Sequence, residues 1–210
     1  DGGPGCRWVG NEHGFAGATN WSFLRTGEVY PGYPKYRELQ YGHADGNQWV
    51  AAECDVSIRP GWFYHPEEDD RVKTVDELTD LYYRSVGHNA TLLLNFPVDR
   101  DGLIHPTDSA NAVNFHQNVQ KQLAHNLLAG LSPKASDERG RTFSAKAVTD
   151  GDYDTYWATN DDVISATIEF DLPQAEKINR MMLQEYIPLG QRVKSFVVEY
   201  NQAGEWIPVK

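Results

Sequence analysis

Hydrophobic positions in the first part of the chain follow a helical period. Between Thr74 and Gly87, apolar side chains recur at a spacing that places them on one face of a helix. Thr74 and Glu77 have the spacing of a capping box, and glycine is a residue type that commonly ends helices. The pattern therefore predicts a helix in this stretch with one apolar face, formed by Val75, Leu78, Leu81, Tyr82 and Val86.

Apolar runs on both sides of this helix predict strands. Residues 49–65, WVAAECDVSIRPGWFYH, read as a buried strand followed by an aromatic turn. The unbroken run Leu92–Leu94 predicts a strand buried on both faces. A second helix is expected from Ser109 to Ala129, with Asp108 as its cap and Gly130 as its stop. Strand–helix–strand–helix order is typical of parallel α/β architectures, in which chemistry lies on the loops that follow the strands.

The pattern changes near residue 131, after which no helical period returns. Apolar and polar residues alternate through residues 164–170 and again through residues 196–200. Such alternation is typical of half-buried strands, and several short strands separated by turns indicate a β-sandwich. The sequence therefore predicts two domains, residues 1–130 and residues 131–210. The strand residues expected to face inward are Ile164, Ala166, Ile168, Phe170, Phe196, Val198 and Tyr200.

Composition narrows the possible partners. The 210 residues carry 30 acidic against 19 basic side chains, a net charge of −11, which argues against nucleic acid as a partner. No apolar run approaches the roughly 18 residues that a membrane-spanning helix needs. The two cysteines, Cys6 and Cys54, lack the spacing of a redox or zinc motif, and a disulfide between them is left open. Because the chain starts without Met and stops within an expected strand, we expect it to be a piece of a longer polypeptide.

Two glutamates are candidates for chemistry. Glu12 lies in GCRWVGNEHG between Gly10 and Gly14, and is either a solvated loop charge or a carboxyl group held in a cleft. Glu53 lies within an apolar run, so it is either a hydrogen-bonded structural anchor or a functional acid. The acidic run at residues 67–70 is expected to be a solvated loop. No spacing supports a serine or cysteine nucleophile, whereas carboxylates among many aromatic residues suit glycoside hydrolysis.

An acidic turn in the second part could bind a cation. Asp150, Asp152 and Thr155 offer oxygen ligands around Gly151, which would suit Ca²⁺. The alternative is a hydrogen-bonded turn that precedes a strand, with Trp157 in the core. The spacing alone does not decide between them.

Three strings from residues 1 to about 130 resemble one enzyme family. GPGCRWVGNEHG, ECDVSIRPGWFYH and LLLNFPVDRDGLI are together similar to the C-terminal half of the catalytic barrel in glycoside hydrolase family 29, the α-L-fucosidases. They look most like its branch that prefers α-1,3- and α-1,4-linked fucose. DGDYDTYWAT and the residues after it are similar to the discoidin-like (coagulation factor 5/8 type C) β-sandwich. The resemblance implies the C-terminal portion of a (β/α)8-type barrel, followed by an all-β sandwich module that is incomplete at its end.

The resemblance also implies roles for individual residues. Glu12 would be the acid/base of a retaining, exo-acting fucosidase, with Glu53 as the runner-up, and Trp62 would wall the fucose pocket. His13 and Trp21 are weaker candidates for substrate contacts. The nucleophilic aspartate of the family lies upstream in a WxDG-type motif that this chain lacks. We therefore expect the missing N-terminal half of the barrel to be a partner, and this piece alone to be inactive.

Further expectations follow from the same resemblance. Catalysis would need no cofactor, the substrates would be fucosylated glycans, and the location would be periplasmic or extracellular. The resemblance favours a structural calcium ion at Asp150, Asp152 and Thr155. The alternative function is a non-catalytic carbohydrate-binding protein that uses the β-sandwich.

Overall fold

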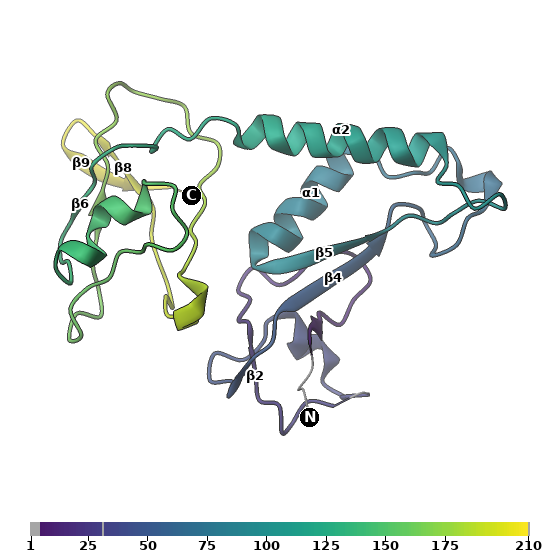
Figure 1. The fold of residues 1–210 in the computed structure, drawn as a ribbon, viewed down its shortest axis with the longest axis horizontal. Helices are drawn as coiled ribbons and strands as arrows, with labels where there is room; N and C mark the ends of the chain where they lie inside the picture. Colours follow the sequence, from purple (N-terminus) through teal and green to yellow (C-terminus); the bar gives the residue numbers. More distant parts are fainter. Residues whose placement is uncertain (1–4, 31, 210) are drawn as a thin grey trace. The chain divides into compact units, whose positions relative to one another are not determined.

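The chain folds into two compact units, Asp1–Asn126 and Leu127–Lys210, shown in Figure 1. The computed structural model describes residues 5–30 and 32–209. The division lies close to the domain boundary expected after residue 130. Within the described ranges, no helix is long and apolar enough to cross a membrane.

A three-stranded parallel sheet organises the first unit. Its strands are β1 (Arg7–Trp8), β4 (Ala52–Ser57) and β5 (Ala90–Asn95), in the order β1-β4-β5. Two short strands, β2 (Phe23–Leu24) and β3 (Gln48–Trp49), pair antiparallel in the segment between β1 and β4. The unit also holds the 3-10 helices Tyr36–Gln40, Pro66–Glu68 and Val86–His88. The predicted parallel α/β arrangement is confirmed for these strands.

The helix α1 (Val75–Ser85) connects β4 to β5 and confirms the first predicted helix. The Thr74 hydroxyl accepts from the Glu77 N–H, and the Glu77 carboxylate accepts from the Thr74 N–H at 2.8 Å. These bonds form the predicted capping box and lower the pKa of Glu77 below its usual value, chiefly through the Thr74 N–H and hydroxyl. A 3-10 turn, Val86–His88, continues the chain beyond the helix through Gly87.

Replacing Thr74 by alanine is expected to lower the free energy of unfolding by about 1 kcal/mol, because the N–H of Glu77 loses its acceptor. Urea unfolding of the variant would measure the change. Thr74→Ser keeps the hydroxyl and should retain most of the stability. Because the folded-state pKa of Glu77 is lowered, the contribution of its carboxylate is present at neutral pH and is lost as the pH falls through that lowered pKa. Equal losses in both variants would contradict this role for the hydroxyl.

The second helix, α2 (Pro106–Leu123), differs from the prediction at both ends. Its cap is His105, whose Nδ1 accepts from the Thr107 N–H at 3.3 Å, and Pro106 occupies the first turn, where its missing N–H has no consequence. The predicted cap, Asp108, instead lies inside the helix with its side chain fully buried. The helix stops at Leu123 rather than Ala129, and the residues from Leu127 onward belong to the second unit.

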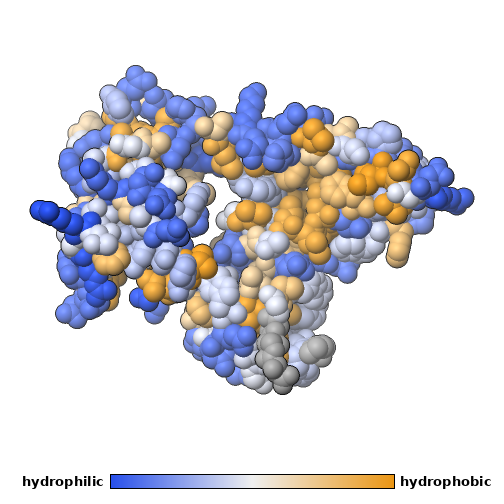
Figure 2. Space-filling model, viewed as in Figure 1, coloured by the Kyte–Doolittle hydropathy of each residue, from blue (hydrophilic) through white to orange (hydrophobic). Residues whose placement is uncertain are grey.

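Only one face of the parallel sheet carries the packed core. Val56 from β4, Leu78 and Leu81 from α1, and Leu92 and Leu94 from β5 pack together there. Leu93 points the other way and is 51% exposed, so the prediction that this strand is buried on both faces is wrong for this chain. Strand residues alternate between faces, and the helices cover just the face of Leu92 and Leu94. Figure 2 shows an area of apolar side chains, in orange, on this face of the molecule. The exposed large apolar residues on β5 and in the segment before α2 are Leu93, Val98, Leu103 and Ile104.

The second unit contains two pairs of short antiparallel strands. Strand β6 (Lys134–Ala135) pairs with β7 (Ile168–Glu169), and β8 (Glu199–Gln202) pairs with β9 (Glu205–Pro208). Three aromatic rings of the unit are in contact: the Tyr156 ring stacks on Tyr186 at 4.4 Å and lies tilted against Phe143 at 4.9 Å. The unit also holds the 3-10 helices Arg141–Phe143, Ala145–Val148 and Ile187–Leu189.

The predicted alternation holds for only part of these strands. Ala166, Ile168 and Phe170 are less exposed than the polar residues between them. Ile164 is 99% exposed, because it follows a turn closed by the Val163 N–H on the Asn160 carbonyl and lies outside any paired strand. Phe196 is 65% exposed, since pairing in that segment begins only at Glu199. Tyr200 is 50% exposed although it lies within β8. The inward-facing assignment of Ile164, Phe196 and Tyr200 was wrong.

Candidate active site

The structure brings two of the predicted site residues together. The indole Nε1–H of Trp62 donates to Glu12 Oε2 at 2.9 Å. Glu12 follows β1 and Trp62 follows β4, and these strands run parallel, so both loops lie at the carboxyl edge of the sheet. In α/β proteins this edge is where binding and catalytic side chains gather. The Glu12 carboxylate is exposed to solvent and oriented by an aromatic donor.

Glycines hold the Glu12 loop close to its neighbours. Gly10 has φ +77°, and a Cβ there would lie 2.4 Å from the carbonyl oxygen of Tyr36. Gly14 has φ +78°, and a Cβ there would lie 2.7 Å from the side chain of Val56 in the core. Between them, Asn11 Oδ1 accepts from the His13 N–H at 3.0 Å. The loop is therefore a tight turn that leaves the Glu12 side chain free to project.

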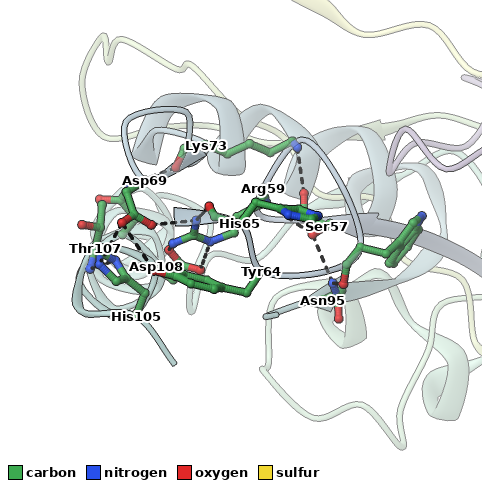
Figure 3. A network of polar contacts seen from close by, with 12 residues as sticks. Ser57, Arg59, Tyr64, His65, Asp69, Lys73, Asn95, His105, Thr107 and Asp108 are labelled. Atoms are coloured by element: carbon green, nitrogen blue, oxygen red, sulfur yellow. Dashed lines mark hydrogen bonds and ion pairs between the residues drawn. The ribbon is translucent and has the colours of Figure 1, made fainter. Parts of the chain in front are cut away.

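A buried arginine anchors the loop that carries Trp62 (Figure 3). Arg59 is 1% exposed, and its guanidinium donates to both oxygens of the fully buried Asp108, at 2.8 and 2.9 Å. A further nitrogen of the same group lies 2.9 Å from Asp69 Oδ1, and the group stands 4.6 Å from the centre of the Tyr64 ring. The bonds to Asp108 raise the pKa of Arg59 above its ordinary value. Arg59 thus joins the loop after β4 to the start of α2.

The acidic run at residues 67–70 is only in part the solvated loop that its charge pattern predicted. Asp69 belongs to the buried network through its ion pair with Arg59. Glu67 and Asp70 are exposed, as expected.

A second set of hydrogen bonds to the Trp62 loop comes from the end of β5. The side-chain amide nitrogen of Asn95 donates to Ser57 Oγ and to the Trp62 carbonyl oxygen, each at 3.1 Å. Figure 3 shows Asn95 beside Ser57, with Lys73 Nζ donating to the Ser57 carbonyl at 2.7 Å. These bonds connect the ends of both neighbouring strands to the Trp62 loop.

The remaining predicted residues make no described contact with Glu12. Glu53 is half-buried on β4; partial desolvation of the Cys6 thiol first, and then the charge of the nearby Glu53, raise the pKa of Cys6. The His13 ring is exposed and stacks on Phe15 at 6.0 Å. The Trp21 carbonyl accepts from the guanidinium of the buried Arg7 at 2.5 Å. The roles of Glu53, His13 and Trp21 stay predictions.

The cysteines do not pair. Both thiols are free; Cys6 is exposed, and Cys54 is buried in a core cluster with Val9, Ala16 and Ala52. Burial is the largest cause that raises the pKa of Cys54 to about 11. Cys54 therefore acts as an inert apolar side chain.

Sequence reasoning missed several polar residues that shape the site. Asp108 was assigned to a helix cap, and neither Arg59 nor Asn95 was singled out. The signal for Arg59 was a charged residue in a run otherwise expected to be buried, because such a charge requires a partner. A fourth residue, Asp55, accepts from the indole of Trp8 at 2.6 Å, and only the pairing of β1 with β4 reveals it.

The acidic turn of the second unit is held by its own hydrogen bonds. Asp150 accepts from the Asp152 N–H at 2.9 Å and from the Thr155 hydroxyl at 2.7 Å, which lowers the pKa of Asp150. Trp157 is half-buried, and its indole donates to the Asp137 carbonyl at 2.9 Å. No group of three or more His, Cys, Asp or Glu able to hold a metal occurs among the residues that the structure describes. The geometry is that of a hydrogen-bonded turn.

A hollow of about 520 Å³ lies away from these groups. It is formed by α1, β5 and α2, and neither Glu12 nor Trp62 lines it. The carboxyl edge of the sheet, rather than this apolar hollow, remains the candidate site. The lining of the hollow includes Tyr82, Leu92, Phe115 and Val119.

Comparison with known proteins identifies relatives of both units. Residues 132–210 match the F5/8 type C domain family. Over 98% of its length the chain is 37% identical to α-L-fucosidase 1 of Arabidopsis thaliana, of which it covers 41%. It matches a Ruminococcus gnavus GH29 fucosidase, solved in complex with fucose, with a TM-score of 0.87 and 34% identity, over 98% of this chain and 42% of that one.

A Bacteroides thetaiotaomicron protein provisionally named as an α-L-fucosidase is also similar in structure. The TM-score is 0.93 at 43% identity, over 98% of this chain and 45% of that one. The chain spans about two fifths of the length of the curated fucosidases that it matches. It is therefore related, over nearly its whole length, to part of the α-L-fucosidases of glycoside hydrolase family 29, and its residues 132–210 correspond to an F5/8 type C domain.

Proposed function

We propose that the full-length protein is a retaining, exo-acting α-L-fucosidase in which Glu12 is the general acid/base. The observation that carries this proposal is the hydrogen bond from the Trp62 indole to Glu12 at the carboxyl edge of the parallel sheet. The similarity to fucosidases supports the substrate class. One of the similar structures is a variant of the Ruminococcus gnavus enzyme with a single aspartate replaced by alanine, also in complex with fucose.

The proposed chemistry uses Glu12 twice. The protonated carboxyl group first gives its proton to the departing glycosidic oxygen, and the carboxylate then takes a proton from the attacking water. Because the Trp62 indole bonds to Oε2, the other oxygen of Glu12 is left to face the substrate. The nucleophilic aspartate would stand about 5–5.5 Å from Glu12, on polypeptide outside this chain.

One face of the sheet is exposed, which supports the proposal that the nucleophile lies on a different segment from Glu12. Leu93 on β5 and Trp8 on β1 are 51% and 43% exposed, although parallel strands are ordinarily covered on both faces. Further strands of a (β/α)8-type barrel would cover this face and bring the nucleophile to the same edge. We propose that the substrates are α-1,3- and α-1,4-fucosylated glycans, met in the periplasm or outside the cell, and that His13 and Trp21 contact them.

Hydrolysis followed by proton NMR would test the function. The full-length protein is expected to release fucose from α-1,3- and α-1,4-fucosylated oligosaccharides and to release the α-anomer first. Initial release of the β-anomer would contradict the retaining mechanism. Glycan binding without release of fucose would favour the alternative, a carbohydrate-binding protein that uses the F5/8 type C domain.

Calcium at the turn from Asp150 to Thr155 is a separate and smaller proposal. The carboxylates of Asp150 and Asp152 are exposed, and each oxygen can accept a hydrogen bond and still offer a lone pair to a cation. Two carboxylates and one hydroxyl supply only part of the six to eight ligands of Ca²⁺. The site would therefore bind calcium weakly, with water completing the shell.

Thermal unfolding would test this calcium proposal. Millimolar calcium is expected to raise the Tm of the second unit, and EDTA is expected to reverse the rise, because a ligand that binds only the folded state stabilises it. Asp150→Asn should abolish the response while leaving the turn in place. The same Tm in calcium and in EDTA would remove the proposal.

A further inference from the structure

The side chain of Asn95, at the end of β5, contacts both the end of β4 and the loop that carries Trp62. Among the described contacts, no other side chain makes this connection. Asn95 is the last residue of β5 and is half-buried. Its amide nitrogen has two protons, and it donates one to Ser57 Oγ and one to the Trp62 carbonyl, each at 3.1 Å. The amide nitrogen therefore has no proton left to donate to a substrate, and both of its protons hold neighbouring segments.

The bond to Trp62 falls in the middle of an otherwise loosely held stretch. Arg59 anchors the loop before Trp62, and the Arg59 guanidinium donates to the His65 carbonyl after it, at 3.4 Å. Between these anchors, Phe63 is 77% exposed, and a Cβ at Gly61 would meet nothing within 4 Å. The main chain around Trp62 thus has little packing to fix it, and Asn95 supplies a directional contact at the position that matters.

The position of the Trp62 main chain decides where its indole points. The indole N–H reaches Glu12 Oε2 at 2.9 Å, and Glu12 itself projects from an exposed turn. Hydrogen bonds weaken steeply with misalignment, so a shift of the loop would release the carboxylate into several orientations. A misplacement of about 1 Å in a catalytic group can cost up to about a hundredfold in rate.

We propose that Asn95 is a positioning residue for the proposed hydrolysis: it fixes Trp62, and through Trp62 it fixes the carboxyl group of Glu12. This inference rests on the function proposed above for Glu12. Two hydrogen bonds transmit this effect. Asn95, at the end of β5, holds Trp62 in the loop after β4, and Trp62 holds Glu12 in the loop after β1.

The variant Asn95→Asp in the full-length protein tests the proposal, because it keeps the shape but replaces both donated protons with a negative oxygen. On a natural fucosylated oligosaccharide, whose leaving group needs a proton, kcat/KM is expected to fall about tenfold or more. On an aryl fucoside with an acidic phenol it should fall less than about threefold, since that leaving group needs little protonation. A merely structural defect would lower kcat/KM by the same factor on both substrates.

The matched control is Asn118→Asp on α2. Asn118 Nδ2 donates to Thr79 Oγ1 at 3.0 Å and so joins α2 to α1, away from the carboxyl edge. This variant loses a hydrogen bond donated by a side-chain amide, as Asn95→Asp does. The ratio of kcat/KM for the oligosaccharide to kcat/KM for the aryl fucoside should stay at the wild-type value. Ser57→Ala, which spares the bond to Trp62, should change the ratio less than Asn95→Asp does.

A spectroscopic readout separates this proposal from the proposed function. The indole ¹H–¹⁵N resonance of Trp62, assigned by its loss in Trp62→Phe, is expected to move upfield in Asn95→Asp and in Glu12→Gln, and to stay in place in Asn118→Asp. An unchanged resonance or an unchanged substrate ratio in Asn95→Asp would overturn the proposal. If that variant does not fold, Asn95→Ala carries the same expectations. Failure of the wild-type protein to release fucose would instead refute the proposed function, and the resonance would still decide whether Asn95 holds Trp62.

Discussion

Glu12→Ala in the full-length protein is expected to lower kcat/KM on fucosylated oligosaccharides by about 10²–10⁴-fold, the range that general acid–base catalysis supplies. The sugar alkoxide that departs is a poor leaving group, and Glu12 is the carboxyl group that the Trp62 indole orients at the carboxyl edge of the sheet. Release of fucose, followed by chromatography, would measure the loss.

The size of the loss should depend on the leaving group. On an aryl fucoside with an acidic phenol, the first step no longer needs a proton, and the decrease in kcat/KM should be much smaller. Azide should restore part of the turnover, because it attacks the glycosyl intermediate without a general base. The product of that rescue would be a fucosyl azide of retained configuration.

Glu53→Ala is the comparison that keeps this assignment falsifiable. Glu53 lies on β4 beside Cys6, and its charge helps to raise the pKa of that thiol. If Glu53→Ala shows the dependence on the leaving group and the rescue by azide while Glu12→Ala shows neither, the acid/base is Glu53. Normal activity of Glu12→Ala on oligosaccharides would exclude Glu12 outright.

Local signals in the sequence were sufficient for the elements that local bonds define. Helix α1 begins where the Thr74–Glu77 pair predicts, because both halves of a capping box lie within one turn of chain. For Glu12 and Trp62, the strand pattern predicted only that both residues lie on loops that follow parallel strands. The resemblance to fucosidases supplied their roles, and the hydrogen bond between them is a result of the fold.

Residues whose partners are distant in sequence were the ones that prediction misassigned. Asp108 has the residue type and the place of a helix cap, yet its partner Arg59 lies on another loop, so no local pattern could show the pair. Leu93 lies in a run that is typical of strands covered on both sides, and this chain covers only one face of that strand. In both cases the pattern describes the residue correctly, and the missing information is which segment packs against it.

The same distant pair links stability to the site. Arg59 and Asp108 are both fully buried, and together they fasten the Trp62 loop to the first turn of α2. A buried ion pair is costly to desolvate, so it contributes little as a pair, but the loss of one partner leaves the other charge without compensation. Damage to this pair is therefore expected to appear both in the free energy of unfolding and in the geometry around Trp62.

Asp108→Ala is expected to lower the free energy of unfolding by about 3–5 kcal/mol, because Arg59 would keep its buried charge with only the partly exposed Asp69 beside it. Urea unfolding followed by tryptophan fluorescence would measure this change.

The double variant Arg59→Met, Asp108→Leu distinguishes the ion pair from simple packing. It removes both charges and keeps apolar volume, so it should be markedly more stable than Asp108→Ala alone. Asp80→Ala is the control at an exposed pair, where Asp80 and Arg84 lie 3.4 Å apart on the surface of α1, and it should change stability little. If the double variant were as unstable as Asp108→Ala, the unpaired guanidinium would not be the cause of the loss, because the double variant has no guanidinium and keeps the apolar volume.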